Sequence, residues 1–162
     1  MESVFVGSSL TLDQFTLPKA QAITRWLLAF VYVPFGLFHI LSPTSFLPIM
    51  PRFVPAPLQM VVFTGACEVL GAIGLLILWT RRPAGVMLAI YAVCVWPANI
   101  YQALAHVHVP PLPDSWWYHG PRLAFQLVMI WAPLFGAGVT GWPLAERARA
   151  RTRRRAGCGR AA

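Results

Sequence analysis

The sequence predicts an all-α fold, a transmembrane four-helix bundle with an N-in/C-in topology. Hydrophobic residues make up 57% of the 162 residues and charged residues only 11%, whereas an average soluble domain carries about 25% charged residues. Four apolar segments are also long enough to cross a bilayer as helices, which takes about 20 residues. A soluble globular fold is excluded, because it would need far more polar surface. The predicted spans are residues 22–41, 58–79, 83–104 and 120–140.

The basic residues set the predicted orientation. Cytoplasmic loops collect Lys and Arg, and the pair Arg81-Arg82 joins the second and third spans. Seven of the 13 Lys and Arg residues follow position 146, so the far end of the chain is also predicted to lie in the cytoplasm. The chain therefore divides into an N-terminal cytoplasmic segment at 1–21, a four-span bundle at 22–140 and an Arg-rich cytoplasmic tail at 141–162.

The loop at 42–57 contains five prolines beside several apolar residues. In the predicted topology it lies outside, like the loop at 105–119, and we expect it to lie in the membrane interface or to cover the mouth of the bundle. Two prolines also fall inside spans, Pro34 in the first and Pro97 in the third. Each is expected to kink its helix and to free a backbone carbonyl that neighbouring groups must satisfy.

The Arg-rich tail accounts for most of the net charge of +8. An arginine run beside a membrane span is typical of an anchor on anionic lipid, worth ~1 kcal/mol per basic residue near the surface. Arginine runs also bind nucleic acid, but nothing else in the chain resembles a nucleic-acid-binding module. We therefore expect the lipid bilayer and anionic lipid as partners, and no nucleic acid.

Glu68 is the only charged residue inside the second span. A carboxylate at that depth costs at least ~2.5 kcal/mol on insertion scales, so it should face protein or water rather than lipid. The residues three and four positions away share its helix face, and all of them are small, which lets another helix approach closely. Glu68 is therefore predicted to lie inside the bundle. These small neighbours are Thr64, Gly65, Gly71 and Ala72.

Every other span also contributes a polar residue to the outer half of the bundle. Glu68 and Arg122 are the candidate catalytic residues, and we expect them to form an ion pair buffered by Asn99 and Gln126. Interhelical polar contacts of this kind also serve simply as helix glue, averaging ~0.6 kcal/mol each. The candidate ligand-binding residues are His39, Asn99, Tyr101 and Gln126.

The histidines and cysteines favour neither a metal site nor a dithiol site. The four histidines, with Asp114, fall near the outer face, but their spacing matches no standard metal motif, and no metal is predicted. No two cysteines form a CxxC pair, so thiol–disulfide exchange is not expected. The residues concerned are His39, His106, His108, His119, Cys67, Cys94 and Cys158.

Four stretches resemble the DoxX-like family of small bacterial integral membrane proteins, and together they cover residues 20–140. The resemblance implies a four-helix protein of the bacterial inner membrane. It also implies a link to quinones, because the family takes its name from a quinone-linked oxidoreductase. The stretches are GLFHILSPTSFLPIMPRFVPAPLQMVVFTGACEVLGAIGLL at 36–76, the Arg-Arg turn at 81–82, PANIYQAL at 97–104 and RLAFQLVMIWA at 122–132.

The same resemblance places the polar residues at the family's recurrent polar positions. The chain departs from the family pattern at Pro51-Arg52, where paired prolines are frequent, and at Ala72, where a second glycine is frequent. These departures leave the fold unchanged but bear on the shape of the pocket and of the loop. The residues at recurrent positions are His39, Glu68, Asn99, Arg122 and Gln126.

Three functions fit these residues. In the first, the bundle binds a lipophilic, quinone-like molecule or a redox partner protein in an outward-facing polar pocket. In the second, it is a membrane-embedded acid–base enzyme, an isomerase, cyclase or ring-opening enzyme, with Glu68 as general acid or base and Arg122 stabilising negative charge. In the third, it is a structural or assembly subunit. The cofactor is unknown: the chain has no covalent or nucleotide cofactor signature, and the family resemblance implies a quinone as one candidate.

Overall fold

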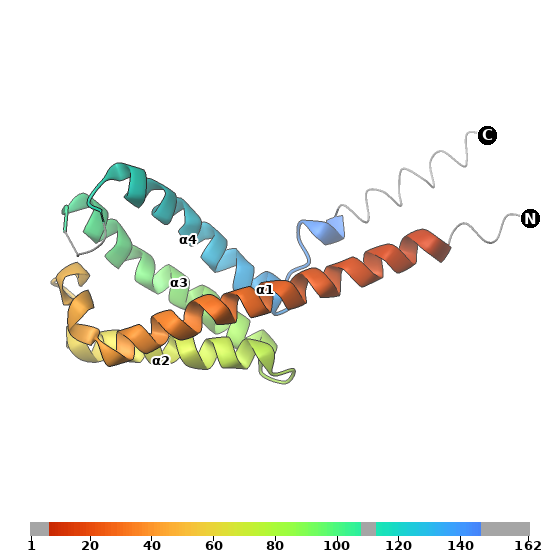
Figure 1. Ribbon diagram of the computed structural model, residues 1–162, viewed down its shortest axis with the longest axis horizontal. Helices are drawn as coiled ribbons and strands as arrows, with labels where there is room; N and C mark the ends of the chain where they lie inside the picture. The colour runs from red at the N-terminus through yellow and green to blue at the C-terminus, as the bar shows by residue number, and fades with distance from the viewer. Residues whose placement is uncertain (1–6, 108–112, 147–162) are drawn as a thin grey trace, which may run out of the picture.

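A computed structural model describes residues 7–107 and 113–146, with side chains from Leu17 onward. The described chain is all-helical and contains no strand, which confirms that the fold is all-α. The described residues form four α-helices and a short 3-10 helix, η1, between the first two, and Figure 1 shows how the α-helices are arranged. These elements are α1 (Gly7–Leu41), η1 (Pro43–Ile49), α2 (Pro57–Leu76), α3 (Arg81–Leu104) and α4 (Trp116–Gly136).

Three described helices are long and apolar enough to cross a membrane: Leu17–Leu41 within α1, Pro57–Leu76 and Arg81–Leu104. Large apolar side chains on these helices point outward, and Phe30 is 79% exposed. Such a surface is unfavourable in water but suits contact with lipid. The structure is therefore consistent with a multi-pass membrane protein, as the composition predicts.

The helix ends differ from the predicted spans for local reasons. α1 already begins at Gly7, well before the span predicted from 22. α2 ends at Leu76 because Ile77 adopts an extended conformation. α4 begins at Trp116, where the side chain of Ser115 accepts a hydrogen bond from the Trp117 amide and caps the helix.

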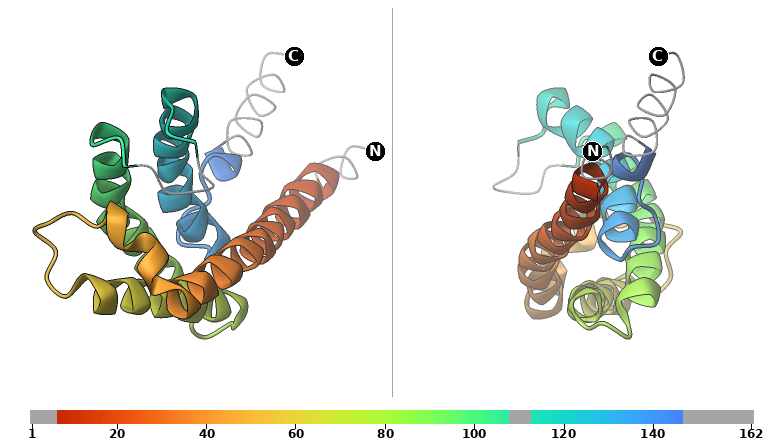
Figure 2. Two further views of the ribbon diagram at one scale, coloured as in Figure 1. Left: turned by 60° about the vertical axis from the view of Figure 1, so that its left-hand side comes forward. Right: turned by 90° about the vertical axis from the view of Figure 1, so that its right-hand side faces the viewer.

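The helices pack in two antiparallel pairs, α1 along α2 and α3 along α4, and the pairs join through α2 with α3 and α1 with α4. Figures 1 and 2 show the consequence. The end of α1, η1 and the start of α4 lie at one end of the molecule. The α2–α3 turn and the end of α4 lie toward the other end.

Glycines allow α1 and α2 to touch along their backbones. A Cβ atom added to Gly36 would lie 2.7 Å from the carbonyl oxygen of Gly65, and the reverse distance is also 2.7 Å. On the other side of α2, a Cβ atom on Gly71 would lie 2.6 Å from the Leu88 side chain of α3. The prediction that small residues beside Glu68 admit neighbouring helices is confirmed at Gly65 and Gly71.

The loop after α1 folds back over the end of the helices. Its 3-10 helix η1 contacts α1, α2 and α3. Phe46 of η1 stacks on the His39 ring with 3.9 Å between ring centroids. The loop therefore packs back onto three helices at this end of the molecule.

Candidate functional site

Glu68 lies between α1 and α3, where two side chains hold its carboxylate. The residue is only 5% exposed. The Tyr91 hydroxyl of α3 donates a hydrogen bond of 2.5 Å to Oε1. His39 of α1 places Nδ1 3.1 Å from Oε2. We call Glu68, His39 and Tyr91 the carboxylate cluster.

The surroundings of His39 fix the state of its ring. Nδ1 lies 3.1 Å from the Glu68 oxygen and 2.8 Å from the backbone carbonyl oxygen of Phe35. A nitrogen that faces two oxygens must carry a hydrogen, because a lone pair there would be repelled. The Nδ1 hydrogen bonds to the Phe35 carbonyl oxygen, so Oε2 of Glu68 lies beside this nitrogen without a hydrogen bond of its own. Tyr91 thus donates to one oxygen of Glu68, and the His39 ring lies in contact with the other.

A second group of polar side chains lies between α3 and α4, and we call it the arginine cluster. Arg122 donates to Oε1 of Gln102 at 2.5 Å and to Oδ1 of Asn99 at 2.6 Å. Asn99 donates to Gln126 at 3.3 Å, and the Gln126 amide donates to the Ala92 carbonyl oxygen at 2.6 Å. The Arg122 guanidinium also lies over the Tyr118 ring, 5.8 Å from its centroid.

Pro97 lies inside α3, but the carbonyl that another helix binds is not the one that this proline frees. Pro97 has no amide hydrogen to donate to the carbonyl of Val93, four residues earlier. The side chain of Gln126 approaches this weakened turn and binds the carbonyl of Ala92, the neighbouring residue. A backbone carbonyl near the proline is therefore satisfied by another helix, and the contact fixes α4 on α3.

The predicted ion pair between Glu68 and Arg122 does not form. Helix pairing explains the difference, since α2 turns Glu68 toward α1 and α3 while Arg122 lies on α4 against α3. Amide oxygens, not a carboxylate, surround the guanidinium. Within the described residues, no acidic side chain forms a salt bridge with Arg122.

Asp114 links two histidines at the end of the α3–α4 seam. Its Oδ1 lies 3.2 Å from Nε2 of His119 and 3.4 Å from Nδ1 of His106. His119 is only 2% exposed, and its Nδ1 is buried without a hydrogen-bond partner. Among the residues that the structure describes, no group of three His, Cys, Asp or Glu side chains is arranged to hold a metal ion. His108 lies outside the described residues.

Residues 28–135 match the model of the family described as Domain of unknown function (DUF8561). The chain belongs to this family. No curated protein and no solved structure matches it.

The DUF8561 domain spans both clusters. Within it, the predicted site residues come together in two groups. His39 joins Glu68, and Asn99 and Gln126 join Arg122. Tyr101 joins neither, because its side chain makes no hydrogen bond to the described residues. Its neighbour Gln102, 2% exposed, takes the place beside Arg122 instead.

Sequence reasoning missed Tyr91, Gln102 and Phe46. Gln102 lies three residues after Asn99 and thus on the same helix face, a signal that was sufficient to find it. Tyr91 lies in an apolar run of α3 and Phe46 in a proline-rich loop, and neither position carries a local signal. Both cysteines of the DUF8561 domain, Cys67 and Cys94, are free thiols, and Cys158 lies outside the described residues.

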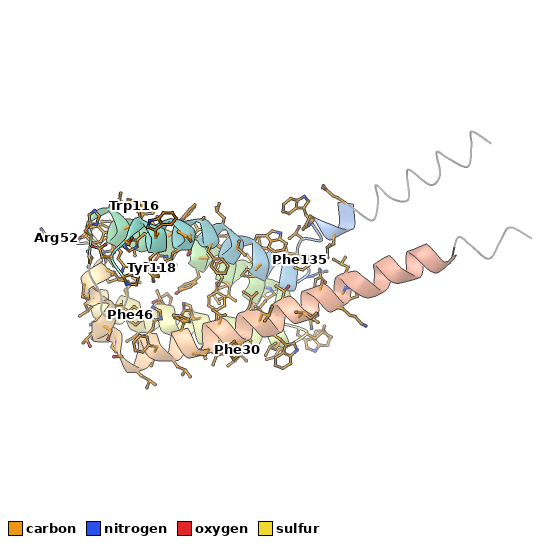
Figure 3. All side chains as sticks on the ribbon, turned by 45° about the horizontal axis from the view of Figure 1, so that its top comes forward. Phe30, Phe46, Arg52, Trp116, Tyr118 and Phe135 are labelled. Carbon is orange, nitrogen blue, oxygen red and sulfur yellow. The ribbon has the colours of Figure 1, made fainter. Side chains whose placement is uncertain are left out.

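Aromatic side chains mark both ends of the DUF8561 domain. At the end where α4 begins, Trp117 is 91% exposed and Trp116 is also exposed. Figure 3 shows Trp116, Tyr118 and Arg52 close to this end. Toward the other end, Trp79 is 91% exposed beside the α2–α3 turn. Tryptophan and tyrosine concentrate at the two interfaces of a bilayer, and the exposed aromatic residues at the two ends are consistent with a multi-pass membrane protein.

Proposed function

We propose that the chain is a DoxX-like inner-membrane protein of bacteria whose four α-helices all cross the membrane, with both termini in the cytoplasm. The aromatic ends and the Arg81-Arg82 turn support this topology. α4 has 21 residues, about 31 Å at 1.5 Å per residue, close to the ~30 Å of a hydrocarbon core. Its polar side chains face α3, while Phe125, Leu127 and Val128 are exposed. Mean hydropathy therefore understates how apolar the outer face of α4 is.

The proposed function is binding of a lipophilic molecule with carbonyl oxygens, such as a quinone, beside Arg122. The observation that carries it is a guanidinium held by Asn99 and Gln102 with no carboxylate beside it. Arginine has five N–H donors, and the described side chains take up two of them. A quinone carbonyl accepts hydrogen bonds from the remaining donors, and such bonds from a charged group are strong.

In this proposal, the carboxylate cluster lies near the binding site and exchanges protons with the bound molecule. Tyr91, which holds Glu68, is adjacent in α3 to Ala92, whose carbonyl binds Gln126 of the arginine cluster. One helix therefore positions both clusters. Because the chain carries no electron-holding motif, electrons for any redox reaction would come from a redox partner protein.

The experiment is extraction and mass spectrometry of lipophiles that co-purify with the protein in detergent. The wild type is expected to retain a ring-bearing lipophile, and Arg122→Gln is expected to retain at least tenfold less. Arg52→Gln is the matched control, because Arg52 is exposed and lies outside both clusters. Phospholipid alone in all three proteins would contradict the proposal, as would equal loss in both variants.

A second candidate function, acid–base catalysis on a hydrophobic substrate, is favoured by the carboxylate cluster. Glu68 is buried, lies between the Tyr91 hydroxyl and the His39 ring, and needs neither metal nor nucleotide. Turnover of the co-purifying lipophile by the isolated protein, lost in Glu68→Gln but kept in Arg52→Gln, would establish an enzyme. Unchanged lipophile with both proteins would leave binding as the function.

A further inference from the structure

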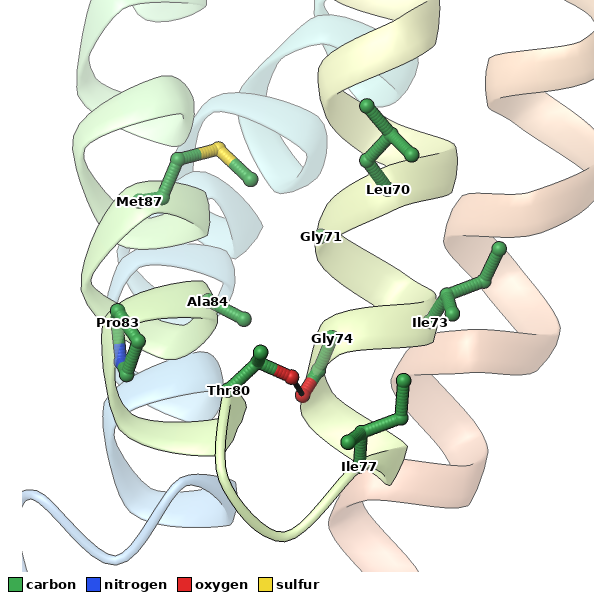
Figure 4. A pocket seen from close by; sticks show the side chains of 9 residues that line it. All are labelled: Leu70, Gly71, Ile73, Gly74, Ile77, Thr80, Pro83, Ala84 and Met87. Atoms are coloured by element: carbon green, nitrogen blue, oxygen red, sulfur yellow. Dashed lines mark hydrogen bonds between the residues drawn. The ribbon is translucent and has the colours of Figure 1, made fainter.

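A groove runs along the outside of the α2–α3 pair, near the turn that joins the two helices. Its volume is about 430 Å³, within the range of ordinary ligand pockets. Figure 4 shows the side chains of both helices around it. The lining residues are Leu70, Gly71, Ile73, Gly74, Ile77, Thr80, Pro83, Ala84 and Met87.

The groove is lined by apolar residues apart from Thr80, and the Thr80 hydroxyl is engaged in a hydrogen bond within the protein. The Thr80 hydroxyl donates to the Gly74 carbonyl oxygen at 2.9 Å, as Figure 4 shows. The small residues Gly74 and Ala84 bring the two helices into close contact beneath the groove, since a Cβ atom on Gly74 would lie 2.8 Å from the Ala84 Cβ, while Ile73 and Ile77 are exposed at its wall. A ligand along this wall therefore has to be hydrocarbon.

Arginines that form no salt bridge with a described carboxylate lie at the end of the groove. Arg81 and Arg82 separate the lining residues Thr80 and Pro83 in the sequence. Arg25 of α1 is near enough to repel Arg81. Nε of Arg81 is buried without a hydrogen-bond partner, and no salt bridge involves these arginines within the described part of the chain. An anion from outside the chain would relieve this repulsion.

We propose that the groove binds one acyl chain of an anionic phospholipid, with the lipid phosphate held by Arg81 and Arg82. The groove supplies apolar surface at the depth of an acyl chain, and the arginines follow directly at its end. Trp79, the residue before Thr80, is almost fully exposed and marks the level of the lipid headgroups. Arginine binds phosphate through paired N–H donors. A neutral protein helix would leave both guanidinium groups without a counter-ion.

The experiment is native mass spectrometry of the full chain titrated with phosphatidylglycerol or with phosphatidylcholine of the same acyl chains. Wild type is expected to bind the first phosphatidylglycerol at least fivefold more tightly than phosphatidylcholine. Arg81→Gln/Arg82→Gln is expected to lose at least fivefold of that affinity. Ile77→Trp, which fills the groove from an exposed position, is expected to weaken the first bound lipid of either kind.

Two controls separate the groove from other basic or apolar surface. Arg52→Gln removes a charge from the opposite end, and Ile90→Trp enlarges an exposed α3 residue outside the groove. Both are expected to bind lipid within twofold of wild type. The Arg-rich tail is present in every variant, so it cannot account for a difference. Equal affinity of wild type for the two lipids, or equal loss in variants and controls, would overturn the proposal.

Discussion

At the scale of single residues, Glu68 and Arg122 both need polar partners inside the protein, and they find different ones. A charge inside a membrane protein needs partners, because lipid offers none. Glu68 faces the Tyr91 hydroxyl and the His39 ring, whereas Arg122 faces the amide oxygens of Asn99 and Gln102. The Glu68 carboxyl group thus lies between a hydrogen-bond donor on α3 and the His39 ring on α1. The positive charge keeps N–H donors for a further acceptor, which is why the binding site is proposed there.

The Tyr91 hydroxyl tests how much the carboxylate cluster stabilises the fold. Tyr91→Phe removes the donor to Oε1 of a buried carboxylate, and we expect the free energy of unfolding to fall by about 1.5–3 kcal/mol. Tyr101→Phe is the matched control on the same helix, because the Tyr101 side chain makes no hydrogen bond to the described residues. Unfolding in detergent micelles measures both. A Tyr91→Phe variant as stable as Tyr101→Phe would mean that the contact contributes little.

At the scale of helices, the identity of the polar residues was predictable, but their partners were not. Spacing shows which side chains share a face, as with Arg122 and Gln126. It does not show which helix that face meets, so Glu68 was assigned to Arg122 although α2 presents it to α1 and α3. Tyr91 was not predicted for the same reason, because only the packing of α3 on α2 makes it a partner of Glu68.

Helix boundaries show a related limit. The spans on α2 and α3 were predicted closely, because uniform apolar runs end at a basic turn. α4 is harder, since its first turns combine tryptophan, tyrosine, histidine and proline with Arg122. These residues lower the hydropathy of the helix although the polar ones are covered by α3. A linear hydropathy average cannot distinguish a lipid-facing position from a covered one.

The contact between α1 and α2 makes a prediction at this scale. Gly65→Ala places a Cβ atom 2.7 Å from the Gly36 carbonyl oxygen, so we expect a loss of about 1–3 kcal/mol in the free energy of unfolding, as for other overpacked cores. Gly120→Ala is the control, because a Cβ atom there has no atom within 4 Å. Alanine favours helix over glycine by up to ~1 kcal/mol, so Gly120→Ala should be neutral or stabilising. Equal thermal stability of the two variants would contradict the close packing.

At the scale of the whole molecule, the two ends differ in chemistry. The carboxylate cluster and the arginine cluster lie toward the end of the molecule that η1 covers. The same end carries Asp114 with two histidines. The opposite end carries Arg25, Arg81 and Arg82 with no paired carboxylate in the described part of the chain. In the proposed orientation, a lipophilic ligand binds toward the outer leaflet and an anionic lipid toward the inner one. The leaflet that supplies each proposed ligand therefore depends on which end faces the cytoplasm.

Cysteine labelling determines that orientation directly. In a background with Cys67, Cys94 and Cys158 replaced by Ser, Arg52→Cys and Arg82→Cys each place one thiol at an exposed position at opposite ends of the molecule. A membrane-impermeant maleimide added to intact spheroplasts is expected to label Arg52→Cys and to spare Arg82→Cys until the membrane is permeabilised. The physical reason is that basic turns remain in the cytoplasm during insertion. Labelling in the reverse order would invert the topology, and the lipid bound by the α2–α3 groove would then belong to the outer leaflet.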